Sequence, residues 1–292
     1  MKLQHQALAL FVVFIWGTNF VFIRVGLDEL PPFTFAALRF FIVAFPLLLF
    51  FPRPKIAWVF LVAYGVLIGF GQFGLLFWAM QENISPGLAS LIIQIQVFFT
   101  ILLSAALMSE TVNAKQMAAL FLCLVGLAVI IVFTDGETTA IGIMVILVAA
   151  LSWALGNVVV KQAGSVNALG FIVWSALFSI PPLALMAWFY EGPTIIVDSI
   201  SHLSWQGWGV VLWQSVGNTL IGYGLWNMLL VRYHAALVAP WALLVPVFGM
   251  SASAIMLGEL MPWWKLLAIG LILAGLSLNM WSNRPKLKVV KR

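Results

Sequence analysis

Residues 88–127 read LASLIIQIQVFFTILLSAALMSETVNAKQMAALFLCLVGL, and residues 237–276 read LVAPWALLVPVFGMSASAIMLGELMPWWKLLAIGLILAGL. The two stretches align without a gap, and ten of the forty aligned positions are identical. One identical pair is charged: Glu110 and Glu259 each separate two long apolar runs. A chance likeness between apolar segments is the simpler explanation, but it does not account for the gapless register and the matched glutamates. The sequence therefore predicts an internal duplication of one apolar hairpin.

The composition indicates which class of protein carries this duplication. The 292 residues are 64% hydrophobic and 8% charged, whereas soluble domains carry about 25% charged residues. Backbone groups in lipid must be satisfied within the chain, so apolar runs of this length are expected to be membrane-spanning helices. We predict an all-α polytopic membrane protein with ten transmembrane helices, over residues 7–27, 32–51, 56–80, 85–108, 114–133, 141–160, 168–189, 205–231, 235–257 and 262–281.

The distribution of charge predicts the orientation of these helices. With both termini in the cytoplasm, 11 of the 14 basic residues lie on the cytoplasmic side, but only one of the nine acidic residues, Glu110, does. This asymmetry agrees with the positive-inside rule for membrane proteins. Five helices per half is an odd number, so the halves, 1–136 and 137–292, are expected to be inverted repeats. The basic tail of the second half is interpreted as a contact for anionic lipid headgroups, and no nucleic acid is expected as a partner.

Several motifs resemble a known family. Residues 14–20 (FIWGTNF), Pro31-Pro32, residues 38–40 (LRF) and the repeated glutamate resemble the EamA-type transporters of the drug/metabolite transporter superfamily. Residues 86–91, 98–101, 152–157, 173–177 and 243–247 are similar to bacterial exporters of O-acetylserine and cysteine. The resemblance implies ten helices in two inverted repeats, alternating access, and export of such small amino-acid metabolites across the bacterial inner membrane. Efflux of drugs or larger aromatic metabolites by the same fold is the alternative.

Polar and aromatic residues within the spans are the candidates for a substrate site, because polar groups in lipid tend to face the interior. Trp16 and Asn19 share one helix face, and so do Trp153 and Asn157. A ring beside an amide suits a small zwitterion, and interhelical packing is the alternative for each pair. The candidate substrate-binding residues are Trp16, Asn19, Arg39, Gln72, Gln94, Trp153, Asn157, Asn218, Tyr223 and Trp226.

Two of the polar positions have predictable geometry. Gln94 and a second glutamine, Gln96, lie about 200° apart around a helix, so only one of them is expected to face a cavity. Arg39 lies deep in the second expected helix, where it could attract a substrate carboxylate. The favoured interpretation of Arg39 is that it snorkels to the interface or pairs with Asp28 or Glu29.

The paired glutamates and a glycine motif complete the candidates. Glu110 and Glu259 are candidate coupling or gate residues, but the favoured interpretation is structural pairing with Lys115 and Lys265. No acidic residue is expected at mid-span, which weakens a proton-coupled mechanism and leaves uncoupled export open.

Residues 69–74 fit a dinucleotide-binding pattern, but they lie inside an apolar span and are interpreted as a close helix contact.

The remaining chemistry-bearing residues are few. The single cysteine, Cys123, gives no disulfide framework, and no metal or cofactor is expected. His5, His202 and His234 fall near span ends, so an enzyme is not expected. The expected partners are a small-molecule substrate and the lipid bilayer, and a homodimer stays open.

Overall fold

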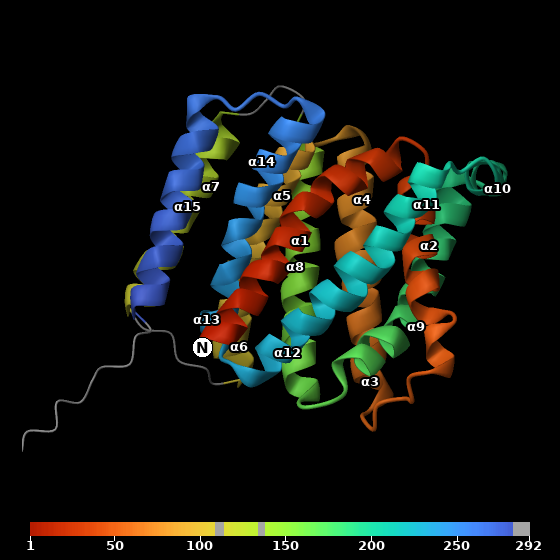
Figure 1. The fold of residues 1–292 in the computed structure, drawn as a ribbon, viewed down its shortest axis with the longest axis horizontal. Coiled ribbons are helices and arrows are strands. Elements are labelled where there is room, and N and C mark those ends of the chain that lie inside the picture. Colours follow the sequence, from red (N-terminus) through yellow and green to blue (C-terminus); the bar gives the residue numbers. More distant parts are fainter. Residues whose placement is uncertain (109–113, 134–137, 283–292) are drawn as a thin grey trace, which may run out of the picture.

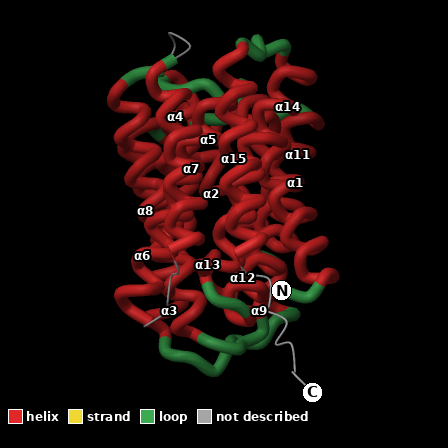
Figure 2. The backbone as a smooth tube through the Cα atoms, turned by 90° about the vertical axis from the view of Figure 1, so that its left-hand side faces the viewer, coloured by secondary structure: helices red, strands yellow, loops and turns green. Residues whose placement is uncertain are grey.

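The structure, a computed structural model, describes residues 1–108, 114–133 and 138–282, and over these ranges it contains helices and loops but no strand (Figures 1 and 2). The α-helices are α1 (Leu3–Leu27), α2 (Pro32–Ala44), α3 (Trp58–Tyr64), α4 (Leu75–Glu82), α5 (Pro86–Ile92), α6 (Gln96–Met108), α7 (Ala114–Val132), α8 (Ala140–Ala163), α9 (Ala168–Met186), α10 (Pro193–Ser201), α11 (Trp205–Leu212), α12 (Gly224–Arg232), α13 (Ala235–Val238), α14 (Val245–Leu257) and α15 (Trp263–Ser282). The shorter or irregular helices are η1 (Leu47–Leu49), η2 (Gly65–Gly74), η3 (Ile93–Ile95), η4 (Ala187–Glu191), η5 (Trp213–Tyr223) and η6 (Ala239–Leu244).

Seven stretches in the described part are long and apolar enough to cross a membrane. They are Leu3–Leu27, Pro32–Leu49, Trp58–Glu82, Pro86–Met108, Ala140–Ala163, Ala168–Glu191 and Ala235–Leu257. Shorter apolar helices occur at Met117–Gly126 and Trp263–Gly275. The continuous helical stretch from α11 through η5 to α12 is long enough as well, but glutamines and asparagines lower its mean hydropathy. The chain is therefore a multi-pass helical membrane protein.

Helical geometry is irregular in the middle of four spans. η2 and η5 have π-helical hydrogen bonding, and η3 and η6 have the tighter 3-10 pattern. π-helical segments are often found at functional sites, because the wider turn displaces backbone and side chains from a regular helix. Three of these segments, η2, η3 and η5, contribute residues to the walls of a small interior cavity.

The helices form one elongated bundle with a peripheral pair. α1 packs against α14 and η5, α8 packs against α6 and η2, and α2 packs against α9. α7 and α15 pack mainly on each other and lie side by side at one edge of the bundle, on the left in Figure 1. The N-terminus and the last described turn of α15 lie at the same end of the bundle (Figures 1 and 2).

The glycines of η2 permit a close helix contact. A Cβ atom at Gly65 would lie 2.2 Å from the carbonyl oxygen of Ser175, and one at Gly69 would lie 2.2 Å from Cβ of Ser179. The hydroxyl of Ser179 donates a hydrogen bond of 2.8 Å to the carbonyl oxygen of Gly65. The interpretation of this glycine motif as a helix-packing element is confirmed.

The stretch between η4 and α11 is expected from the sequence to be a connection, but it contains a further helix. α10 covers Pro193–Ser201 and projects at the edge of the bundle opposite α7 and α15 (Figure 1). The matched tryptophans Trp16 and Trp153 are 137 positions apart, whereas Leu88 and Leu237 are 149 apart. An insertion that includes α10 accounts for this change of offset.

Candidate functional site

A small cavity lies between the middle of α1 and the irregular segments. Its volume is about 20 Å³, which is room for roughly one water molecule. α1, η2, α4, η3, α8, η5 and α14 contribute its walls, through Trp16, Asn19, Phe20, Ile23, Gln72, Phe73, Leu76, Ile93, Gln94, Trp153, Asn218, Tyr223 and Val245. The bundle is therefore packed closely around a cavity whose walls combine aromatic and amide side chains.

Trp16 is the centre of the aromatic wall. Its ring centroid lies 5.1 Å from that of Trp153, 4.8 Å from that of Tyr223 and 5.0 Å from that of Trp226. These separations are in the range of favourable aromatic pairs. A Cβ atom at Gly222 would lie 2.5 Å from the Trp16 Nε1 atom, so the position of the indole depends on a glycine at residue 222.

Several polar atoms of the lining residues have no hydrogen-bond partner within the described part of the chain. They are the indole nitrogens of Trp16 and Trp153 and the amide oxygens of Asn19 and Gln94, and all four atoms are buried. Leaving a buried polar group unpaired costs about 1–3 kcal/mol. The indole nitrogens can only donate and the amide oxygens can only accept. The cavity thus combines donors suited to a carboxylate with acceptors suited to an ammonium group.

Other polar groups at the cavity are already paired. The side chains of Gln72 and Tyr223 are joined by two contacts, of 2.7 Å from Gln72 Nε2 and 2.9 Å to Gln72 Oε1. Asn218 lines the cavity and donates to Gln214 Oε1 over 3.1 Å. The Gln72–Tyr223 pair links η2 to η5 and fixes the orientation of the tyrosine, whereas the Asn218–Gln214 bond lies within η5.

The structure brings seven of the ten predicted substrate-binding residues together at the cavity and places three elsewhere. Trp16, Asn19, Gln72, Gln94, Trp153, Asn218 and Tyr223 line it, whereas Arg39, Asn157 and Trp226 do not. Asn157 Nδ2 donates to Gln96 Oε1 and to Thr100 Oγ1, and Asn157 Oδ1 accepts from Trp226 Nε1.

The predicted difference between the two neighbouring glutamines is confirmed. Gln94 lines the cavity, while Gln96 bonds to Asn157 on α8.

Arg39 is fully buried, and the favoured interpretation of it is wrong. Its guanidinium donates 2.9 Å to Gln214 Oε1 and also bonds to the hydroxyl of Thr219. The Arg39 Cζ atom lies 3.9 Å from the ring centroid of Phe73. The residue neither snorkels nor pairs with Asp28 or Glu29, because the π-helical turns of η5 place two acceptors beside it. Asp28 pairs instead with Arg24, and Glu29 bonds to Ser204.

The end of the bundle where α1 and α4 finish has a larger hollow of about 870 Å³. Charged residues on its walls are Arg24, Asp28, Glu82, Glu259 and Lys265. Lys265 Nζ lies 3.5 Å from Glu259 Oε2, so the predicted pairing of Glu259 with Lys265 is confirmed. Its counterpart Glu110 lies outside the described residues.

The opposite end is held together by interactions between α1, α8 and α12. Lys161 Nζ, at the end of α8, donates to the carbonyl oxygens of Leu230 over 3.0 Å and Tyr233 over 2.9 Å. The Tyr233 hydroxyl lies 2.6 Å from His5 Nδ1. These contacts join three helices at the N-terminal end of the bundle.

Sequence reasoning missed Glu191, which caps α2 from a distant part of the chain. Its carboxylate accepts from the backbone nitrogens of Phe33 over 2.6 Å and Thr34 over 3.0 Å, and also from the Thr34 hydroxyl. The first turn of α2 has no capping side chain of its own, since Pro31 occupies the N-cap. This missing cap is the signal that an acceptor must come from elsewhere.

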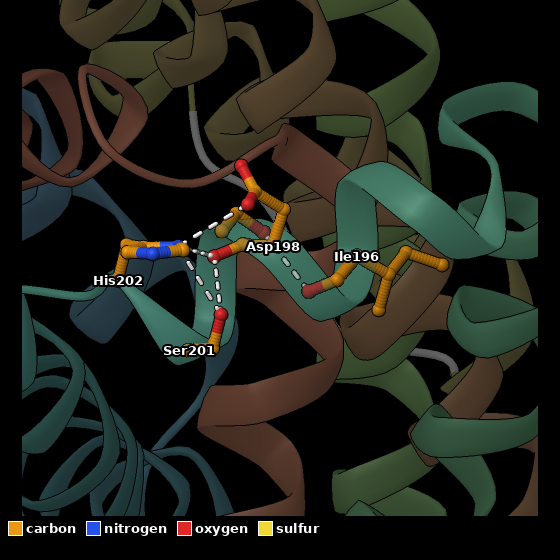
Figure 3. Close-up of polar contacts among 5 residues, drawn as sticks. Ile196, Asp198, Ser201 and His202 are labelled. Carbon is orange, nitrogen blue, oxygen red and sulfur yellow. Dashed lines mark hydrogen bonds and ion pairs between the residues drawn. The ribbon is translucent and has the colours of Figure 1, made fainter.

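Residues near the end of α10 have the types found in a hydrolytic triad but not the geometry (Figure 3). His202 Nδ1 lies 3.2 Å from both Asp198 Oδ1 and Ser201 Oγ. In a triad the serine and the acid face different ring nitrogens. The side chains of His202 and Asp198 are 78% and 76% exposed, and none of the three residues lines the cavity. The cluster is a local contact at the end of a helix.

The fold and the cavity together define a class of protein. A multi-pass helical bundle with interrupted helices around a small interior cavity of aromatic and amide side chains is the arrangement of a small-molecule transporter.

Known proteins with similar sequences agree with this class. A sequence model of the EamA-like transporter family matches residues 5–132 and 140–281. A protein of Salmonella typhimurium named "Probable amino-acid metabolite efflux pump" is 41% identical over 290 residues, which cover 97% of each chain. A protein of Escherichia coli K12 with the same name is 38% identical, again over 97% of each chain. The chain belongs to the EamA-like transporter family.

A solved structure supports the fold alone. One crystal structure superimposes with a TM-score of 0.75 at 18% sequence identity and covers 97% of this chain and 99% of its own.

Proposed function

We propose that this chain exports small amino-acid metabolites, of the size of cysteine or O-acetylserine, and binds them in the central cavity. The observation that carries the proposal is the set of unpaired donors and acceptors at Trp16, Trp153, Asn19 and Gln94. The carboxylate of a zwitterion can accept hydrogen bonds from the two indole N–H groups, and its ammonium group can donate to the two amide oxygens. The names of the two bacterial relatives support the same substrate class.

The cavity has to open for transport, so the proposal includes alternating access. Its volume of about 20 Å³ is far below that of an amino acid. The charged hollow at one end and the contacts of Lys161 at the other are consistent with a protein that is closed at the N-terminal end. Glu259 and Glu110 are the proposed gate or coupling residues, since Glu259 lies on the wall of the hollow.

We further propose ten spans in two inverted repeats, residues 1–136 and 137–292. The two separate family matches support this division. The irregular segments support it too, since a shift of 149 residues moves 65–74 of η2 onto 214–223 of η5. The excess of basic residues supports cytoplasmic termini, and the bacterial relatives support the inner membrane.

The experiment that tests the function is counterflow of radiolabelled cysteine or O-acetylserine into proteoliposomes preloaded with unlabelled solute. We expect label to accumulate transiently only in liposomes that contain the protein, and we expect no requirement for a pH gradient. Folded protein that gives no counterflow with any small amino acid would overturn the assignment. Counterflow that needs a pH gradient would keep the substrate and return attention to Glu110 and Glu259.

A second candidate function rests on a different hollow. An apolar groove of about 820 Å³ runs between the ends of α8 and α9 and the face of η5 and α12, where Leu169, Leu220 and Met228 line it. A groove of this size would accept a larger aromatic solute, as the drug-efflux alternative requires. Resistance of cells that overproduce the protein to a panel of aromatic drugs, with no excretion of amino acids, would favour this second function.

A further inference from the structure

Arg39 is a buried cation without an acidic partner in the described part of the chain. Its exposed fraction is 0%. Its guanidinium bonds to the neutral side chains of Gln214 and Thr219. It also lies near the rings of Phe40, Phe73 and Phe77. The Nε atom of the same guanidinium has no partner. Arginine stays charged in proteins, and a buried charge without an opposite charge is strongly unfavourable. A purely structural role would be served at lower cost by a neutral side chain.

The position of the guanidinium relates it to the cavity. Phe73, whose ring lies 3.9 Å from Arg39 Cζ, is one of the cavity walls. Gln214 Oε1 accepts from both Arg39 and Asn218, and Asn218 also lines the cavity. The positive charge therefore lies directly behind two cavity residues, in surroundings of low dielectric where its field is weakly screened.

We propose that Arg39 makes the central cavity selective for substrates that carry a carboxylate. The inference rests on the proposed function and adds the feature by which substrates are distinguished. Arg39 is a positioning residue that acts through Phe73, Gln214 and Asn218 and through its field. A zwitterionic amino acid brings a carboxylate close to this charge, whereas the corresponding decarboxylated amine brings only a second cation.

The test compares cysteine with cysteamine, which lacks the carboxylate, as competitors of labelled cysteine counterflow. We expect wild-type protein to bind cysteine more than about tenfold better than cysteamine. Gln214→Glu places a carboxylate where Gln214 already accepts from Arg39, so it preserves the hydrogen bond but cancels the field. We expect this variant to reduce the preference for cysteine about tenfold or more. If Arg39 has only a structural role, Gln214→Glu should be stable and should keep the wild-type preference for cysteine over cysteamine.

Matched variants complete the test. Gln206→Glu introduces the same change at an exposed position of α11 and should leave the preference unchanged. Arg39→Lys keeps the charge and should keep most of the preference, whereas Arg39→Gln should lose it. If Arg39→Gln does not fold, the cysteine preference of Gln214→Glu still tests the role of Arg39.

The outcomes separate the two proposals. Counterflow of cysteine with an unchanged preference in folded Gln214→Glu would overturn the role of Arg39 and leave the function intact. An equal response of wild-type protein to cysteine and cysteamine would do the same. The absence of any amino-acid counterflow in folded wild-type protein would overturn both.

Discussion

The contact between Glu191 and the start of α2 gives a prediction whose size can be worked out from the structure. Glu191 is 9% exposed and accepts three hydrogen bonds from Phe33 and Thr34. A hydrogen bond to a charged group contributes about 1.5–3 kcal/mol, and contributions within one cluster are not additive. Glu191→Ala leaves two backbone N–H groups without an acceptor, so we expect a loss of about 3 kcal/mol of stability. Glu191→Gln keeps one acceptor oxygen and should lose about 1 kcal/mol.

The assay is unfolding of the purified protein in detergent or lipid, followed by circular dichroism. A loss of about 3 kcal/mol corresponds to a fall of roughly 5–10 °C in the melting temperature. Asp198→Ala is the matched control, because this acid lies on α10 with a side chain 76% exposed. A melting temperature of Glu191→Ala within 1 °C of wild type, or equal losses for the alanine and glutamine variants, would refute the capping role.

Three further predictions concern helix packing, the aromatic wall and the closed end of the bundle. Gly69→Val should lower the melting temperature or prevent folding, because even a Cβ there would lie 2.2 Å from that of Ser179; Gly209→Val, at a position with open space, is the control. Gly222→Ala should displace the Trp16 indole and raise the half-saturation concentration for counterflow several-fold, and an unchanged value would contradict the tight contact between them. Lys161→Met should increase hydrogen exchange at the end of α12 several-fold in mass spectrometry, whereas Lys161→Arg should change it less, and equal exchange in all three proteins would argue against the contact.

Much of the architecture could be predicted from the sequence, because apolar runs that must satisfy their own hydrogen bonds leave little choice but helix. What the sequence did not indicate is the departure from regular helix in η2, η3, η5 and η6. An α-, π- or 3-10-helical turn differs only in which carbonyl oxygen each backbone N–H bonds to. The residue composition of these segments is nearly the same as that of a regular α-helix, so composition does not reveal the difference. α10 was missed because its apolar stretch is too short to span a membrane.

The site was predictable where the spacing along one helix decides the outcome. Gln94 and Gln96 fall on different faces, and the structure places only Gln94 at the cavity. Spacing along α8 could not show whether the side chain of Asn157 lies at the cavity. Asn157 shares a helix face with Trp153, but it bonds to Gln96 because η3 and α6 pack beside α8. The partners of Arg39 are 175 and 180 positions away, so only the folded arrangement reveals them.

The central claim is that the unpaired atoms of the cavity bind the substrate, and the two neighbouring glutamines test it most directly. Gln94→Leu removes an acceptor at the cavity, while Gln96→Leu removes a buried amide of the same type that bonds to Asn157 instead. The measurement is the half-saturation concentration for cysteine counterflow in both variants. We predict an increase of about tenfold or more for Gln94→Leu, since a hydrogen bond to a charged group is lost, and little change for folded Gln96→Leu. An unchanged value for Gln94→Leu, or an equal increase in both variants, would contradict the account.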